Sequence, residues 1–266
     1  MSNDNFVKKD SIVRQIWGKS DTVLFIFAGA SAEFACNKAV DWLYFTGKLP
    51  ADPIGRLFST VSYARAILFS ENDDALHAID TMSAIHSKVE AKRGAKIPDW
   101  AYRDVLFMLI DYSIRSFELL ERKLTPTEKY EVFDVFNRLG IRMGLTGLPT
   151  DFEQWQIMRK QHLVENLQRS GLTDDLFIQY RKHLGALRYR ILLESQMLIV
   201  PQQVRILLGF RKISLLHPLL SVYKLSRILK IDRLLKAILL PSKYKNEINA
   251  MDTYAIKKCP FSSRAR

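Results

Sequence analysis

The stretch DPIGRLFSTVSYARAILF, residues 52–69, decides the fold class. Asp52 has the side chain of a helix N-cap, and Pro53 is favoured at the first helical position because that N–H would have no partner in the helix. The apolar residues that follow recur at the spacing of one helix face: Leu57, Val61, Ala64 and Leu68. We therefore predict an amphipathic helix over residues 54–69.

The same helical periodicity extends in both directions from this segment. Loops that contain Pro or Gly separate the periodic segments, and the capping box Thr125–Glu128 marks one helix start. No alternating pattern indicates a pair of β-strands. The other helices are predicted over residues 21–44, 74–92, 100–122, 125–143, 174–198 and 219–240, with one more after the cap at 150–153.

These segments predict an all-α protein, a single globular bundle of about eight to ten helices. Apolar residues make up 48% of the 266 residues, charged residues 26%, and 11 Gly and 9 Pro are few for an all-β fold. No linker divides the bundle. We expect residues 1–20 to be an N-terminal extension, residues 21–240 to form one helical domain, and residues 241–266 to form a basic tail.

Charge is concentrated in the C-terminal third of the chain. Residues 181–266 contain 18 Lys and Arg but 4 Asp and Glu, a net charge of +14, whereas the other 180 residues carry −2. Such a basic region favours an anionic partner, such as a membrane surface, a nucleic acid or an acidic ligand. No nucleic-acid-binding motif or aromatic platform accompanies the charge, so we expect no nucleic-acid partner.

The chain shows no sign of secretion or membrane insertion. Its first ten residues lack an apolar leader segment, and no apolar run reaches 18 residues. The two cysteines, Cys36 and Cys259, form no disulfide framework and no zinc motif. We therefore expect a cytoplasmic protein in a reducing setting.

His86 is one candidate for chemistry. The five histidines never fall at metal-ligand spacing from one another, and the nucleotide, metalloprotease and serine hydrolase signatures are absent. His86 lies on an apolar helix face, where a histidine is most simply a core residue. Its functional alternative is a single axial ligand, because haem brings four nitrogen ligands of its own.

Arg56 and Thr60 are the second candidate pair. They lie four residues apart, so they share a face of the helix predicted over 54–69. The simplest interpretation is a structural ion pair for Arg56 and a Thr60 hydroxyl bonded back to its own helix.

The order of these features resembles the mpaB-type oxygenase and latex-clearing protein (rubber oxygenase) catalytic-domain family. The match begins at Asp52-Pro53-Ile54-Gly55-Arg56-Leu57 with Thr60, and continues at Phe69-Ser70-Glu71 and Ile85-His86-Ser87-Lys88-Val89. The start at Pro98-Asp99, Leu124-Thr125 with Glu128, and residues 144–149 with Phe152 follow in the expected order. The resemblance covers about residues 21–167 and, weakly, the rest of the chain. Ser59 departs from the family, because latex-clearing proteins have a Lys directly before the Thr.

The resemblance implies a haem b-dependent oxygenase, an oxidoreductase that acts with dioxygen on an apolar, lipid- or isoprenoid-like substrate. By this resemblance His86 is the proximal ligand of the haem iron, in a buried pocket. Arg56 would orient a haem propionate or polarise oxygen, and Thr60 would donate or relay a hydrogen bond. Glu33 and Asp41 are both candidates for a catalytic base, and spacing does not choose between them.

The basic helix at residues 219–240 leaves a second interpretation open. Its long Lys and Arg side chains fit a surface helix that covers apolar neighbours. They also fit peripheral contact with an anionic membrane, which would suit a lipid-like substrate. The alternative to an enzyme is therefore a non-enzymatic helical protein that binds a membrane surface or a partner through this helix.

Overall fold

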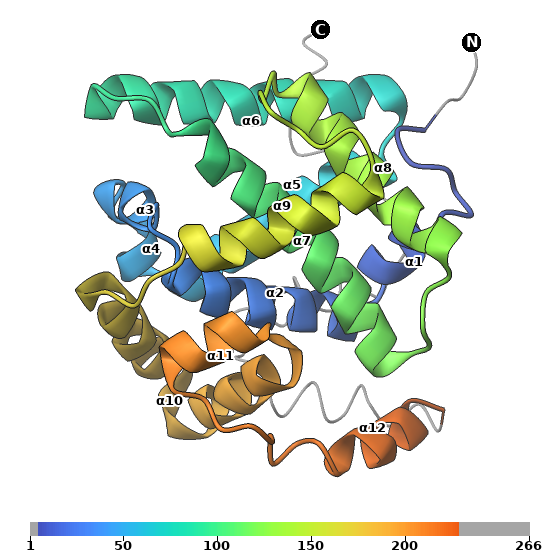
Figure 1. Ribbon diagram of the computed structural model, residues 1–266, viewed down its shortest axis with the longest axis vertical. Coiled ribbons are helices and arrows are strands. Elements are labelled where there is room, and N and C mark those ends of the chain that lie inside the picture. Colours follow the sequence, from blue (N-terminus) through green and yellow to red (C-terminus); the bar gives the residue numbers. More distant parts are fainter. Residues whose placement is uncertain (1–4, 229–266) are drawn as a thin grey trace, which may run out of the picture.

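The computed structural model of this chain describes residues 5–228, with side chains as far as residue 224. Within this range the protein consists of helices, loops and two isolated β-bridges, without a β-sheet (Figure 1). The predicted all-α fold is confirmed.

Twelve helices lie in the described range. Their order along the chain is α1 (Ile12–Trp17), α2 (Ser20–Ala35), α3 (Asp41–Phe45), α4 (Lys48–Ala51), α5 (Pro53–Phe69), α6 (Asn72–Arg93), α7 (Asp99–Leu120), α8 (Pro126–Arg142), α9 (Phe152–Glu165), α10 (Gly171–Ile199), α11 (Gln202–Leu208) and α12 (Leu219–Ile228).

Helix α2 is the centre of the bundle, and it packs most extensively on α7 and α10. Figure 1 shows α9 crossing in front of α7, with α6 along the opposite edge from α10 and α11. The close approach of α2 and α7 depends on Gly29. A Cβ atom at this position would lie 2.2 Å from the ring of Tyr112, so only glycine fits without a shift. The tight contact holds α2 against the middle of α7.

The N-terminal residues differ from the expected extension, because α1 lies in the core. Val13, Ile16 and Trp17 are fully buried, and the indole Nε1 of Trp17 donates a hydrogen bond to Ser113 Oγ on α7 at 3.1 Å. The reason is apolar burial: packing the apolar face of this short helix against α5, α7 and α8 removes it from water, which stabilises the folded chain. The bundle therefore begins before residue 21.

The predicted helix over residues 21–44 is interrupted, and the cause is tertiary. After α2 the chain pairs with the segment that follows α9, where Gln168 N donates to Cys36 O at 2.7 Å and Lys38 N donates to Asn166 O at 3.0 Å. These bonds satisfy backbone groups that a continuous helix would have used internally. Helix α3 then starts afresh.

The predicted helix over residues 174–198 contains a sharp bend. Gly185 has φ 71° and ψ 171°, which is outside the helical region and readily adopted only by glycine. Helix α10 therefore consists of two limbs, residues 171–184 and residues 186–199. The bend gives the two limbs different directions.

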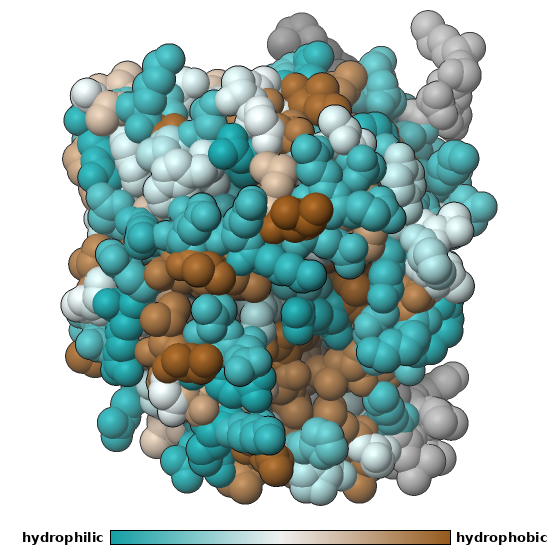
Figure 2. Space-filling view, viewed as in Figure 1, coloured by the Kyte–Doolittle hydropathy of each residue, from teal (hydrophilic) through white to brown (hydrophobic). Residues whose placement is uncertain are grey.

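The C-terminal part of the described chain exposes apolar side chains. Helix α12 covers the first ten residues of the predicted helix at 219–240, and residues 229–240 lie outside the described residues. In Figure 2 brown, apolar surface gathers in the lower half of the face, where α10, α11 and α12 lie in Figure 1. Several large apolar side chains in this part are more than half exposed: Ile206, Ile213, Leu215, Leu219 and Val222.

Candidate functional site

The start of α5 positions Arg56 and Thr60. Asp52 caps the helix, because its Oδ1 accepts a hydrogen bond from Gly55 N at 2.9 Å. Gly55 is required here, since a Cβ atom would lie 2.4 Å from the other carboxylate oxygen of Asp52. One turn later Arg56 Nη1 donates to Thr60 Oγ1 at 3.2 Å and to Ser59 Oγ at 2.9 Å. The cap therefore fixes the turn that carries all three side chains.

Thr60 behaves as the simpler interpretation predicted, because its hydroxyl donates back to Arg56 O at 3.1 Å. Arg56 behaves differently. No carboxylate in the described range lies within ion-pair distance of its guanidinium, although the side chain is only half exposed. Arg56 thus holds a positive charge near the end of the α5/α6 pair without an acidic partner.

His86 lies on α6 beside this turn. Its ring meets the ring of Tyr102 edge to face, with centroids 5.2 Å apart, and the Tyr102 hydroxyl donates to Glu90 Oε1 at 3.0 Å. The Nδ1 atom of His86 is buried and has no hydrogen-bond partner. Because buried polar atoms nearly always have a partner, an orphaned imidazole nitrogen indicates a missing ligand or hydrogen bond.

The charge state of His86 suits a ligand. Burial lowers the pKa of His86, the nearby Arg56 guanidinium lowers it further, and Glu90 raises it in part. The imidazole is therefore neutral at pH 7. A neutral imidazole has a lone pair on one nitrogen, which is the form that binds a metal ion.

Burial changes along the α5/α6 pair. At one end the two helices bury Ala64, Ile67 and Leu68 of α5 against Ala75 and Ile79 of α6. At the other end, residues 55–60 and 81–90 are half-buried or exposed. The end that carries Arg56, Thr60 and His86 thus has apolar side chains that the bundle does not fully cover, among them Leu57, Phe58, Met82, Ile85 and Val89.

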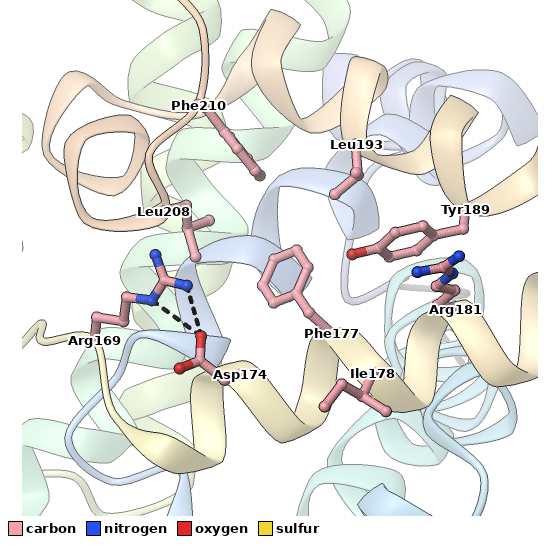
Figure 3. Close-up of a pocket in the computed structure, with 9 residues that line it drawn as sticks. All are labelled: Arg169, Asp174, Phe177, Ile178, Arg181, Tyr189, Leu193, Leu208 and Phe210. Carbon is pink, nitrogen blue, oxygen red and sulfur yellow. Dashed lines mark hydrogen bonds and ion pairs between the residues drawn. The ribbon is translucent and has the colours of Figure 1, made fainter. Parts of the chain in front are cut away.

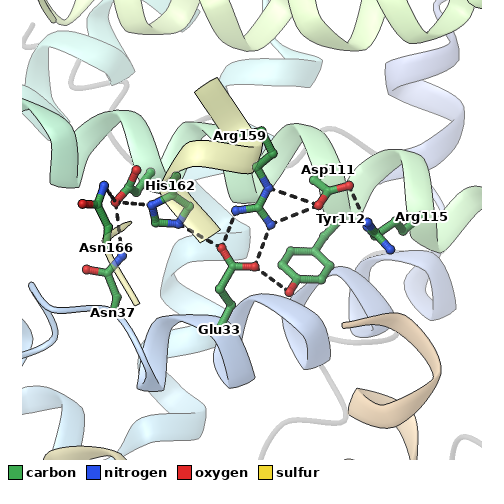
Figure 4. Close-up of polar contacts among 9 residues, drawn as sticks. Glu33, Asn37, Asp111, Tyr112, Arg115, Arg159, His162 and Asn166 are labelled. Atoms are coloured by element: carbon green, nitrogen blue, oxygen red, sulfur yellow. Dashed lines mark hydrogen bonds and ion pairs between the residues drawn. The ribbon is translucent and has the colours of Figure 1, made fainter. Parts of the chain in front are cut away.

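Glu33, a candidate base, lies in a buried cluster of charges (Figure 4). Arg159 Nη2 donates to Glu33 Oε2 at 2.6 Å, and the hydroxyl of Tyr112 donates to the same oxygen at 2.8 Å. His162 Nε2 lies 3.1 Å from Glu33 Oε1. Because Glu33 is fully buried and accepts from three side chains, its carboxylate is enclosed on all sides within the bundle.

The rest of the cluster balances these charges. His162 Nδ1 lies 2.6 Å from Asp104 Oδ2, and Arg159 Nη2 donates to Asp111 Oδ2 at 3.0 Å. Burial alone would raise the pKa of Glu33, but Arg159 and His162 lower it to about 2. Burial lowers the pKa of His162, but Asp104 and Glu33 outweigh that effect and raise it. We call Glu33, Asp104, Asp111, Arg159 and His162 the buried charge cluster.

Asp41, the other candidate base, lies at the surface of α3. It forms an ion pair with Arg93 Nη2 at 2.6 Å, and the Arg93 guanidinium stacks on Trp42, 4.0 Å from the ring centroid. Arg93 ends α6, the helix of His86. Asp41 is therefore the candidate that is accessible to solvent at the His86 end of α6.

Comparison with known protein families now bears on this arrangement. Residues 17–228 match the family described as ER-bound oxygenase mpaB/B'/Rubber oxygenase, catalytic domain. The chain belongs to this family. It is therefore an enzyme of the oxidoreductase kind, an mpaB/rubber-oxygenase-type oxygenase, as the sequence resemblance predicted. No curated protein and no solved structure matches the chain.

The described residues include neither a metal-binding cluster nor a membrane-spanning helix. Among residues 5–228, no group of three or more His, Cys, Asp and Glu side chains could hold a metal ion. Over the same range no helix is both long enough and apolar enough to cross a membrane.

Sequence reasoning missed Arg159 and His162, although a signal was present. The two residues are three apart on α9 and share the helix face of the buried Trp155. Glu33 likewise follows the apolar run at residues 22–32 without a break. A charged residue on a face otherwise destined for the core indicates a buried partner of opposite charge.

Proposed function

We propose that this mpaB/rubber-oxygenase-type oxygenase depends on haem b and acts with dioxygen on an apolar, lipid- or isoprenoid-like substrate. His86 is the proposed iron ligand. The observation that carries the proposal is its buried Nδ1 atom, which has no hydrogen-bond partner, beside the unpaired charge of Arg56.

The residues at this end of the α5/α6 pair fit a haem group. A single neutral imidazole is enough when the porphyrin supplies four nitrogen ligands. The half-buried apolar side chains around His86 suit a flat apolar ring system, and haem propionates need a cation such as Arg56. Bound haem iron would supply the activation of dioxygen, which no protein side chain can supply.

Two further residues have proposed roles in the same site. Arg56 would hold a propionate, and its charge would keep His86 neutral through repulsion. Thr60 has its hydroxyl beside Arg56 and would donate a hydrogen bond inside the pocket by exchanging its bond to Arg56 O for one to a bound group. Asp41 would accept a proton at its carboxylate, because its ion pair with Arg93 is half exposed, whereas Glu33 is sealed.

A visible absorption spectrum tests the proposal. The full chain, purified after expression with added haem, should show a Soret band, and His86→Ala should lose or shift it. His77→Ala is the matched control, because His77 lies on the same helix but is exposed, and it should leave the spectrum unchanged. A colourless protein that takes up no added haem would overturn the proposal.

We also propose, as a second function, peripheral contact with an anionic membrane through the C-terminal part of the chain. The half-exposed to exposed apolar side chains of residues 206–222 alternate with Arg211, Lys212 and Lys224, a combination that suits the membrane interface. The family description, which names ER-bound oxygenases, is consistent with this.

Vesicle flotation tests the membrane contact. Phosphatidylserine vesicles should carry the full chain at low salt and release it as salt rises. Removing the charges at Arg211, Lys212, Arg227, Lys230 and Arg233 should weaken the binding. Equal flotation with neutral phosphatidylcholine vesicles, or by the charge-depleted variant, would contradict an electrostatic contact.

A further inference from the structure

A separate pocket lies between the two limbs of α10 and the chain that follows α11 (Figure 3). It has a volume of about 370 Å³. The bend at Gly185 contributes to it, because side chains of the limb at 171–184 and of the limb at 186–199 both line the pocket. None of its lining residues belongs to α5 or α6, so it is distinct from the His86 end of that pair.

The walls of the pocket are apolar. Phe177 and Ile178 come from the first limb and Leu193 from the second, whereas Leu208 ends α11 and Phe210 follows that helix. Gly209 has φ 64°, and this left-handed turn sends Phe210 back toward Phe177, with the ring centroids 6.3 Å apart. A pocket of this size with mostly aromatic and aliphatic walls is typical of a small-molecule site.

The polar groups of the pocket are few, and one side of it is cationic. In Figure 3 the Tyr189 ring lies between Leu193 and Arg181, with its hydroxyl directed into the pocket. Burial raises the pKa of Tyr189, and the positive charge of Arg181 lowers it in part. The pKa is raised on balance, so the hydroxyl stays protonated and can donate a hydrogen bond. Along residues 5–228, no carboxylate pairs with Arg181.

On the opposite side of the pocket the charged side chains form an ion pair with each other. Arg169 donates to Asp174 Oδ1 through Nη2 at 2.7 Å and through Nε at 3.0 Å, so that its charge is already compensated. The pocket therefore offers one free guanidinium and one hydroxyl at one side, with apolar walls elsewhere. This is the complement of an apolar chain that ends in an anionic group.

We propose that this pocket binds a single-chain amphiphile with a carboxylate head, such as a medium-chain fatty acid. The apolar chain lies between Phe177, Leu193 and Phe210, and the carboxylate accepts hydrogen bonds from Arg181 and Tyr189. The volume is near the lower limit for ligand pockets, which favours one chain over a two-chain lipid. The proposal does not depend on haem, since no residue is shared with the His86 site.

Calorimetric titration of the full chain with decanoate, below its micelle concentration and at neutral pH, tests the proposal. We expect saturable binding of one decanoate per chain. Decanol has no charge, and decyltrimethylammonium has the wrong charge, so both should bind roughly tenfold or more weakly, the usual effect of losing one charge-assisted hydrogen bond.

Variants separate the head site from the chain site. Arg181→Gln should weaken decanoate binding about tenfold and leave decanol binding unchanged, whereas Lys182→Gln, an exposed neighbour on the same limb, should change neither. Leu193→Trp should abolish binding by filling the pocket. Leu208→Phe adds less volume to the pocket and should also abolish decanoate binding. Circular dichroism checks that each variant is folded.

His86→Ala separates this proposal from the proposed haem function, because it should leave decanoate affinity unchanged whatever happens to haem. The proposal is overturned if decanoate shows no saturable binding. It is also overturned if the two filled variants bind decanoate as tightly as the parent chain, or if decyltrimethylammonium binds equally well.

Discussion

Two histidines of this protein lie near an arginine, and their surroundings shift their pKa values in opposite directions. His162 lies beside Arg159 in the buried charge cluster, where both ring nitrogens face carboxylates and the pKa of His162 is raised. His86 lies near Arg56 without a compensating carboxylate on that arginine, one ring nitrogen has no partner, and the pKa is lowered. Carboxylates beside both ring nitrogens favour a structural role for His162, and their lack at His86 is compatible with the ligand role proposed above.

Removing one member of the buried charge cluster should have the largest effect. Glu33→Ala leaves Arg159 and His162 buried without their shared carboxylate, so the free energy of unfolding should fall by about 3–5 kcal/mol. Urea unfolding followed by circular dichroism measures it. Arg142→Gln breaks the exposed ion pair with Asp80 and should lower the free energy of unfolding far less. Similar losses in both variants would show that the cluster contributes no more than a surface pair.

The two histidines should give stability profiles of opposite slope. The pKa of His162 is raised above its ordinary value of 6.5, so its contribution to stability is complete below about pH 6.5 and is lost as pH rises through the higher folded pKa. The pKa of His86 is lowered, so its contribution is present above pH 6.5 and is lost as pH falls toward the folded pKa.

Unfolding free energies at several pH values check these slopes. The difference in unfolding free energy between the parent chain and His162→Gln should narrow on the alkaline side, as the raised pKa of His162 is passed. The difference for His86→Gln should change below neutral pH and stay smaller throughout, because His86 is only half-buried. A constant difference for His162→Gln at all pH values would mean that its charge adds nothing to the cluster.

The smallest effect concerns the coupling between Arg56 and His86. Arg56→Gln removes a positive charge that lowers the pKa of His86, so that pKa should rise toward its ordinary value. A titration of the imidazole protons by NMR measures it. Arg142→Gln, which acts on the other half of α6 through Asp80, is the control and should leave the pKa of His86 unchanged. An unchanged pKa of His86 in Arg56→Gln would show that the charge of Arg56 does not affect the imidazole.

Local sequence signals predicted most of the helices well. Asp52 and Pro53 gave the start of α5, and the capping box of Thr125 and Glu128 gave the start of α8. The break after α2 was not predicted, because it depends on hydrogen bonds to a segment about 130 residues away. The bend at Gly185 was not predicted either, since an isolated glycine is compatible with a continuous helix.

The residues of the candidate site were predicted from the order of the family's motifs, because helical periodicity alone does not distinguish them from structural residues. Periodicity placed Arg56, Thr60 and His86 on helix faces, and the structure brings them to one end of the α5/α6 pair. The buried charge cluster escaped prediction because its members come from α2, α7 and α9. Pairing among helices so far apart in sequence leaves only a weak local signal, such as Glu33 at the end of an apolar run.

The buried charge cluster also bears on how the chain is made. Both cations that compensate Glu33 come from α9, and Arg159 is synthesised 126 residues after Glu33. A nascent chain that has released α2 and α7 but not α9 would bury the Glu33 carboxylate without either cation if those helices docked. We therefore expect the docking of α2 on α7 at Gly29 and Tyr112 to be less favourable until α9 is present, because only then does Glu33 gain its ion pairs. Close packing of the N-terminal helices thus depends on a guanidinium encoded in the second half of the chain.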